Sequence, residues 1–463
     1  MAEEAYLIGA SDQALWMGLG PTRLAVLATA VLLAVTAGYA GTPLPLAALP
    51  LAVAAAWCFG VVRGAALHEL TLAGASLASR FTTGNHQIRA SLDAHAPARP
   101  APDSAPTALE LPRACGRLAL AALEVDGLEV GVLCERGRQG WDVLCLLRVV
   151  GDSGFSLLDP VEQTRRLSGW GEVLTALAGE YADRCRLQWV ETAAPAQTGQ
   201  AAESGLTAAV AAQSLCHRTL LAVRVSTGQR DRTLATRSAE PLSRLLASRL
   251  LSAELIGEPL SRVDVQRHLR LAMTGTFEAP DLIRAGPAIG PASHAEAWDH
   301  LRTDDTWHRS YLITGWPRIP VGPAWLSPLL AEGPTPGWRS VAMHFHAVRP
   351  ELAGRRARAA RQSASLDVDD RTRLGFGVGA RERRTQLQAD AVEEELAAGH
   401  VQHRVAGLIL VSANSQSDLD DACRQTIAAA SAARLDVHAL HGRHADGWAA
   451  ALPLCRLGHR SPA

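Results

Sequence analysis

Apolar and polar positions divide the chain into an apolar beginning and a longer, mixed remainder. Two runs without a charged residue come first, at residues 24–42 and 44–62. At 1.5 Å per residue, each is long enough as a helix to cross the roughly 30 Å hydrocarbon core of a bilayer. Gly41-Thr42-Pro43 between them predicts a turn. We therefore expect a transmembrane helical hairpin, with a hairpin buried in a soluble fold as the alternative.

The arginines next to these runs predict an orientation. Arg23 precedes the first run and Arg63 follows the second, whereas the connecting turn has no charge. By the positive-inside rule, both ends of the hairpin face the cytoplasm, so we expect a multi-pass protein of the cell inner membrane. Beyond Arg63, apolar residues recur at three- and four-residue steps from 67 to 81, which predicts an amphipathic helix.

Period-two patterns after residue 112 predict strands. Residues 118–125, 128–134 and 141–150 read as a meander, in which Asp126-Gly127 is a strong signal for a type I′ hairpin turn. Asp159-Pro160 then supplies an N-cap and a first-turn proline for a helix to about residue 179. A strand at 185–189 follows. The first folded unit is therefore predicted as β-meander, helix, strand.

The rest of the chain shows both patterns, the alternation typical of strands and the three- to four-residue spacing typical of helices. We expect a strand at 219–225, helices between 231 and 273, a strand at 340–348 and a charged helical run from 351 to 399. A strand at 405–411, a helix capped by Ser417, a strand at 435–440 and a short helix at 447–452 predict a closing βαβ-type unit. The fold class is predicted as α+β behind an amino-terminal transmembrane hairpin. The expected domains are a membrane anchor (1–63), an amphipathic connector (64–92), a Pro/Ala-rich linker (93–112) and a cytoplasmic α+β region (113–463), divisible into 113–285 and 286–463.

Composition excludes several functions. All 45 cationic Lys and Arg positions are arginine. A P-loop needs a lysine to reach the β- and γ-phosphates, and Schiff-base enzymes need a lysine amine, so both classes are excluded for this chain. The net charge of −1 gives no global attraction for nucleic acid, and direct binding to it is not expected. The eight cysteines form no C-x-x-C motif and are expected to be buried, reduced thiols.

Fragments that look catalytic are incomplete. His68-Glu69 opens like a zinc-protease helix, but Leu72 stands where the second histidine would be. His344 and His346 lie on one face of a predicted strand without a third ligand. We therefore predict no catalytic residue, no cofactor and no metal.

A partner interface is predicted from tryptophans and arginines, which are enriched at binding hot spots. Four tryptophans fall between residues 298 and 325, and residues 349–384 hold ten arginines against five acids. A solvated helix face is the alternative for the arginine run. The predicted interface residues are Trp298, Arg302, Trp307, Trp316, Trp325, Arg355, Arg356 and Arg358.

Several short motifs, in their order along nearly the whole chain, resemble those of a known family. They are Ser168-Gly169-Trp170-Gly171, Trp298-Asp299, Trp316-Pro317-Arg318, Leu326-Ser327-Pro328-Leu329-Leu330, Ala398-Gly399-His400 and Leu452-Pro453-Leu454. The family is that of actinobacterial membrane proteins described as PrgI-like, found in conjugative elements beside a conjugative ATPase. The resemblance implies a two-span anchor joined to a region similar to the amino-terminal domain of that ATPase, and it carries no catalytic residues.

The resemblance also implies a function. We expect a non-enzymatic inner-membrane scaffold of a conjugation or type IV-like secretion apparatus, which anchors or docks a separate ATPase at the cytoplasmic face. Its partners would be the bilayer, the ATPase and other apparatus subunits, and a homo-oligomer is left open. A type VII secretion component resembling EccE and a membrane-tethered enzyme are the two alternatives.

Overall fold

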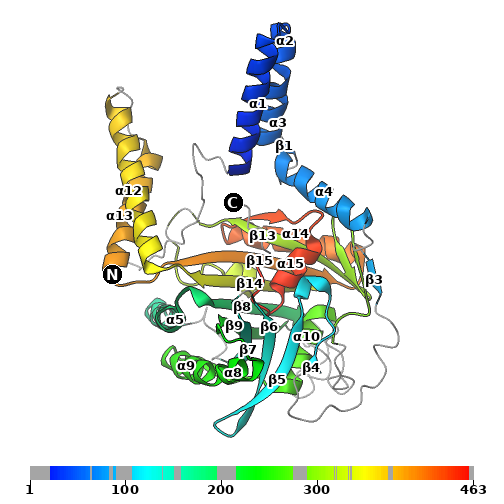
Figure 1. Cartoon of the computed structure of the whole chain (residues 1–463). Coiled ribbons are helices and arrows are strands. Elements are labelled where there is room, and N and C mark those ends of the chain that lie inside the picture. Colours follow the sequence, from blue (N-terminus) through cyan, green and yellow to red (C-terminus); the bar gives the residue numbers. More distant parts are fainter. Residues whose placement is uncertain are drawn as a thin grey trace.

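The computed structural model describes most of the chain. The described residues are 21–62, 65–82, 87–89, 107–137, 139–150, 158–195, 215–274, 289–317, 319, 321–331, 333, 336–373 and 379–457. Most of the predicted linker (93–112) lies outside them, as does Arg63. Figure 1 shows one sheet-centred body from which two helical hairpins extend, α1–α3 and α12–α13.

The amino-terminal elements and the first half of the body have the following bounds: α1 (Pro21–Tyr39), α2 (Leu44–Ala47), α3 (Leu49–Phe59), β1 (Val61–Val62), β2 (Ala65–Ala66), α4 (Leu67–Thr82), β3 (Gln87–Arg89), β4 (Thr107–Ala108), β5 (Leu118–Val125), β6 (Leu128–Arg136), β7 (Trp141–Val150), α5 (Pro160–Tyr181), β8 (Cys185–Pro195), β9 (Leu215–Ser226), α8 (Arg232–Arg237), α9 (Ala239–Ser252), β10 (Ile256–Pro259) and α10 (Arg262–Thr274).

The second half of the body contains β11 (Ser293–Glu296), β12 (Leu301–Thr303), β13 (Thr306–Gly315), α11 (Ser327–Leu330), β14 (Trp338–Ala347), α12 (Pro350–Arg373), α13 (Ala380–Ala397), β15 (His403–Ala413), α14 (Gln416–Ala432), β16 (Asp436–Ala439) and α15 (His444–Ala451). Every strand pair in the body is antiparallel.

The 14-stranded sheet repeats one topology twice. Along it the strands run β3-β11-β12-β13-β15-β14-β8-β9-β7-β6-β5-β4, with β10 added to β7 and β16 added to β13. In the first half, β7 pairs with β9 along one side, and with β6 and then β10 along the other. In the second half, β13 pairs in the same way with β15, and with β12 and then β16. The two halves are therefore topological copies of each other.

The copies are joined in the middle of the sheet. The inner strands β8 and β14 pair antiparallel, from Arg339 opposite Ala193 to His346 opposite Arg186. In each copy, one helical crossover joins two strands that lie on opposite sides of a third. In the first copy β9 and β10 lie on either side of β7, and in the second copy β15 and β16 lie on either side of β13. The predicted closing βαβ-type unit is therefore a split one, because β13 lies between β15 and β16.

Helices cover both faces of the sheet, and three apolar clusters fill the spaces. One cluster contains Leu242 of α9 beside β5–β9, and a second contains Leu419 of α14 beside β13–β15. The third lies on the other face, where Leu269 of α10 and Trp448 of α15 pack on both copies. The core is therefore continuous across the junction, which favours one cooperative body.

Two predictions from short sequence motifs are confirmed, at a turn and at a helix cap, where interactions between residues close in sequence decide the structure. Asp126 and Gly127 both have positive φ, 53° and 80°, as a type I′ turn requires. The side chain of Asp159 accepts hydrogen bonds from the backbone N–H groups of Val161 and Glu162, and Pro160 begins α5. The α+β class is also confirmed. The cap of α14, however, is Ser415 and not Ser417.

The predicted transmembrane hairpin is wrong. Among the residues that the structure describes, none of the helices has both the length and the apolar content needed to cross a bilayer. The second uncharged run is broken at Ala48, so α3 has 11 residues and is about 16 Å long. The uncharged part of α1 ends at Tyr39 and is about 24 Å long, also short of the roughly 30 Å core. This contradicts the predicted membrane anchor and the predicted multi-pass inner-membrane location.

Helix α4 attaches the α1–α3 hairpin to the body (Figure 1). The indole N–H of Trp57 in α3 donates to Oγ1 of Thr71 in α4 at 2.8 Å. At the other end of α4, Arg80 forms ion pairs with Glu296 of β11 at 2.6 Å and with Asp446 of α15 at 2.9 Å. The predicted amphipathic helix is therefore a connector that packs on its own body.

Candidate functional site

The predicted tryptophans are mostly packing residues. Trp316 is 8% exposed and belongs to the cluster beneath α14, where Trp307 and Trp325 pack against it. Trp298 is 40% exposed, and its ring stacks on His441 with centroids 5.7 Å apart. Gly74 of α4 faces that ring. Trp298 therefore helps to seat the connector helix on the body.

Arg302 lies beside one of these tryptophans, but the predicted arginines of α12 do not join them in one patch. Trp307 pairs with Ala413 at the end of β15, next to Arg302, whose guanidinium lies 5.4 Å from the Trp307 ring centroid. The α12–α13 hairpin begins beside His403, at the start of the same strand. The two groups are therefore about 30 Å apart along β15, at about 3.3 Å per residue.

Charges in the α12–α13 hairpin are partly neutralised within it. Arg361 of α12 forms ion pairs with Asp390 at 3.0 Å and Glu393 at 2.8 Å in α13. The predicted excess of five positive charges was counted over residues 349–384, so it did not include Asp390 and Glu393. Arg355 and Arg358 remain exposed on α12, whereas Arg356 is half-buried. Exposed arginines also lie toward the other end of the hairpin, at Arg373, Arg383 and Arg384, so the basic surface is not confined to its base.

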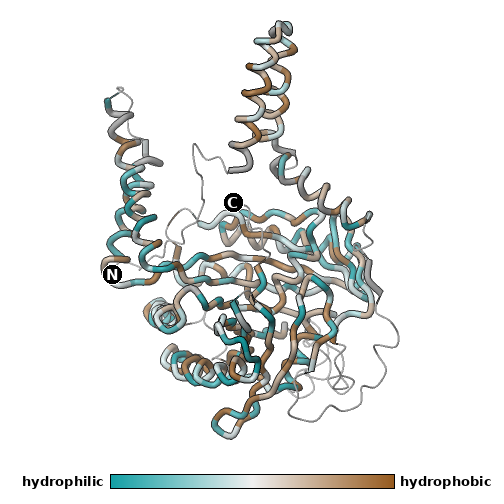
Figure 2. Tube along the Cα trace, in the orientation of Figure 1, coloured by the Kyte–Doolittle hydropathy of each residue, from teal (hydrophilic) through white to brown (hydrophobic). Residues whose placement is uncertain are grey.

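Both hairpins expose large apolar side chains. On α12–α13 these are Leu366 at 60% and Leu387 at 69% exposure, while alanines such as Ala357 fill the seam between the helices. Figure 2 shows the long apolar segments of the α1–α3 hairpin in brown. There Leu32 and Val53 are 63% and 61% exposed, and α1 and α3 border an apolar groove of about 600 Å³. Exposed apolar surface of this kind is typical of binding regions.

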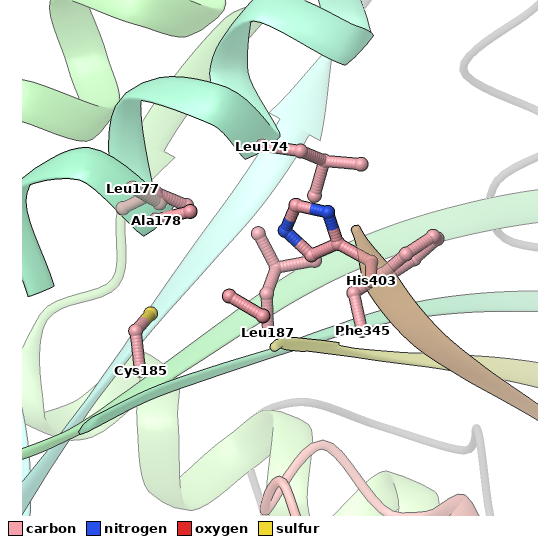
Figure 3. Close-up of a pocket in the computed structure, with 8 residues that line it drawn as sticks. Leu174, Leu177, Ala178, Cys185, Leu187, Phe345 and His403 are labelled. Carbon is pink, nitrogen blue, oxygen red and sulfur yellow. The ribbon is translucent and has the colours of Figure 1, made fainter. Parts of the chain in front are cut away.

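A small cavity lies between α5 and the sheet. Figure 3 shows its lining residues, which include Leu174, Cys185, Leu187, Phe345 and His403. Its volume is about 10 Å³, enough for one water molecule and too small for a substrate. Burial raises the pKa of the Cys185 thiol to about 12 and lowers the pKa of His403. Cys185 is thus a protonated core thiol and not an activated nucleophile.

A serine–histidine–threonine chain is buried inside the second copy. His308 contacts Oγ of Ser412 through Nδ1 at 2.8 Å and Oγ1 of Thr303 through Nε2 at 2.6 Å. Ser412 is fully buried, and burial lowers the pKa of His308 to about 3. The imidazole of His308 is therefore neutral and buried, and it links neighbouring strands. These three side chains hold β12, β13 and β15 together rather than face a substrate.

The predicted histidine pair on β14 has structural contacts too. His344 donates through Nε2 to the Ala450 carbonyl at 2.9 Å, and His346 donates through Nδ1 to the Cys185 carbonyl at 3.2 Å. Among the described residues, no group of three or more His, Cys, Asp or Glu side chains could hold a metal ion.

A row of basic side chains, which the sequence did not reveal, crosses the middle of the sheet. His346 of β14 pairs directly with Arg186 of β8 on one side and with Arg404 of β15 on the other. Directly paired residues point to the same face, so the three side chains form one row. Arg186 is exposed, and His346 and Arg404 are half-buried. Arg356 of α12 interacts with Arg404 from the base of the hairpin. We call Arg186, His346, Arg404 and Arg356 the basic row.

Comparisons with known proteins add no family: no family model matches the chain, and no curated protein matches it.

Proposed function

We propose that the chain is a non-enzymatic scaffold of a conjugation or secretion apparatus, which docks a separate ATPase. The observation that carries the proposal is the α12–α13 hairpin, a pair of helices that leaves the sheet between two paired strands and presents Leu366, Leu387, Arg355 and Arg358 to solvent. Leucine and arginine side chains on a projecting helix pair suit a helix-packing partner surface.

The surroundings of the titratable groups also support a non-catalytic function. His308 and Cys185 are buried in packing positions, and the cavity beside Cys185 holds no substrate-sized volume. Catalytic acids and bases need access to a reacting group within hydrogen-bonding distance. His308 and Cys185 serve packing in the core instead.

The test removes the hairpin without cutting the sheet. Because β14 and β15 are neighbours in the ladder, residues 350–400 can be replaced by a short Asn-Gly turn that preserves the pair. Binding of the full chain and of this variant to a purified conjugative ATPase is measured by isothermal titration calorimetry. We expect binding by the full chain and a loss of at least about tenfold, or about 1.4 kcal/mol, in the variant. Equal affinities, with circular dichroism showing an intact sheet, would refute the proposal.

A further inference from the structure

The α1–α3 hairpin projects from the body and carries apolar side chains around both of its long helices (Figures 1 and 2). Residues 24–62 contain no charged side chain. On α1, Val31 and Leu33 are 48% and 53% exposed, although they point in opposite directions on the helix. A helix that is apolar on all sides is normally buried against other apolar surface. The described part of the body does not supply that cover.

One face of this hairpin combines small and large side chains. It holds the groove of about 600 Å³ between α1 and α3. The small lining residues include Ala25, Thr29 and Ala54. The large ones include Leu33, Leu49 and Val53, which are 53%, 57% and 61% exposed. Because both sizes share one face, the large side chains of one hairpin can enter the small-residue positions of an identical hairpin. The groove face is therefore self-complementary, as a two-fold symmetric interface requires.

The polar groups in the lining of the groove have partners within the chain. The hydroxyl of Thr29 donates to the Ala25 carbonyl at 2.8 Å, and the indole N–H of Trp57 donates to Thr71 of α4. Covering the groove with apolar side chains therefore leaves neither donor without an acceptor.

The area of the groove face is sufficient for a specific interface. The 19 residues of α1 are about 28 Å long, and residues 44–59 of α2 and α3 are about 24 Å long. With helices about 10 Å wide, the flat footprint is about 520 Å² per copy, or about 1,040 Å² in total. Specific interfaces begin at about 1,000 Å² in total, and the relief of the side chains adds to the flat value.

Other occupants suit this face less well. Nucleic acid or a charged peptide would find no charge to pair with on residues 24–62. A bilayer is disfavoured because none of the described helices is long and apolar enough to cross one. An identical hairpin, by contrast, matches the groove in chemistry, length and shape.

We propose that the groove face of the α1–α3 hairpin binds the same face of a second copy of this chain, so that the two hairpins form a four-helix bundle. The surface belongs to a different hairpin from α12–α13. The inference therefore does not depend on the proposed docking of an ATPase.

The test measures the mass of the full chain by sedimentation equilibrium in detergent-free buffer over a range of concentrations. We expect a dimer that dissociates on dilution. The double variant Leu33→Asp/Val53→Asp places one charge on the groove face of each helix and should weaken the dimer at least about hundredfold. Circular dichroism checks that the helix content is kept.

A matched control makes the same two kinds of substitution on the opposite face. Val31→Asp/Leu51→Asp changes positions two residues earlier in each helix, which corresponds to a rotation of about 200°. Val31 and Leu51 are 48% and 39% exposed. We expect the control to keep the dimer affinity within about threefold of that of the unchanged chain.

A measurement without any variant decides the case in which the groove variant loses its hairpin. Oxidative footprinting of the unchanged chain compares concentrations at which monomer and dimer predominate. Leu33 and Val53 should be oxidised less in the dimer, and Val31 and Leu51 equally in both. A monomer at every concentration, equal losses in the two double variants, or protection of Val31 and Leu51 instead would overturn the inference. A monomeric chain that floats with phosphatidylglycerol vesicles would also overturn it, in favour of a lipid surface.

Discussion

An ion-pair network centred on Arg80 joins α4 to the body, in addition to the contact of Gly74 with Trp298. Arg80 bridges Glu296, whose side chain is 2% exposed, and Asp446, which is 34% exposed. The other oxygen of Glu296 accepts a hydrogen bond from the Ala445 N–H at the beginning of α15, at 2.9 Å. Arg80→Ala would leave a buried carboxylate with one donor and an acidic neighbour. Breaking a buried pair costs about 3–5 kcal/mol. Because Arg80 is 24% exposed and the Ala445 donor remains, we expect about 3 kcal/mol.

The loss of stability caused by Arg80→Ala should depend on pH. Burial raises the pKa of Glu296 above its ordinary value although Arg80 acts in the opposite direction. Without Arg80 that pKa rises further. A carboxyl group whose folded pKa is raised stabilises the fold most below its unfolded pKa, and that contribution is lost as pH rises through the folded pKa. The penalty of Arg80→Ala should therefore be larger at pH 8 than at pH 5.

Urea unfolding at pH 5 and pH 8, followed by circular dichroism, measures the penalty. Hydrogen exchange of the α4 amides detects undocking of the connector alone. Arg80→Ala/Glu296→Gln should recover part of the loss, since the neutral amide does not carry a buried charge. Arg244→Ala, which removes an exposed pair with Asp126, is the control and should leave the free energy of unfolding nearly unchanged, because solvent screens an exposed pair. Unchanged stability and unchanged α4 exchange, or a larger penalty at pH 5, would refute the reasoning.

Two further predictions concern stability. Asp159→Ala should lower the free energy of unfolding by about 1 kcal/mol because α5 loses two cap hydrogen bonds, and Asp159→Asn should not; an equal loss in both would contradict the cap assignment. Burial lowers the pKa of His308 to about 3, of His344 to about 4 and of His444 to about 3. Because these imidazoles take up protons in the unfolded chain first, the free energy of unfolding should fall as pH drops below about 6.5. The slope should be up to about 1.4 kcal/mol per pH unit for each histidine. Urea titrations from pH 7 to pH 4.5 check this, and a His308→Gln slope equal to that of the unchanged chain would contradict it.

Local structure was predictable because local interactions decide it. The strands around Asp126-Gly127 and the cap at Asp159 follow from turn chemistry and side-chain hydrogen bonds within a few residues. The two uncharged runs, by contrast, led to the wrong prediction of a transmembrane hairpin. Absence of charge indicates apolar surface but does not fix helix length, and a new, short helix begins at Leu49 after the break at Ala48, with Pro50 in its first turn.

The basic row could not be predicted because it depends on register. Arg186, His346 and Arg404 are separated by more than 50 residues from one another, and only the pairing of β8, β14 and β15 places them side by side. The duplicated topology was hidden for the same reason, since β10 and β16 add to strands far from them in sequence. The tryptophans of residues 298–325 were predicted as interface residues, yet Trp316 lies in the core cluster of its own half, and Trp307 and Trp325 pack against that cluster. The wider interface prediction for these residues stays a prediction.

Hydrogen exchange of the full chain, with and without a purified conjugative ATPase, tests the proposed docking function most directly. Amides of α12, α13 and the adjoining ends of β14 and β15 should exchange more slowly in the complex, because the partner covers the hairpin and its base. Amides of α9, on the far side of the first copy, should be unchanged. Protection restricted to other elements, with α12 and α13 exchanging as in the free chain, would contradict the account.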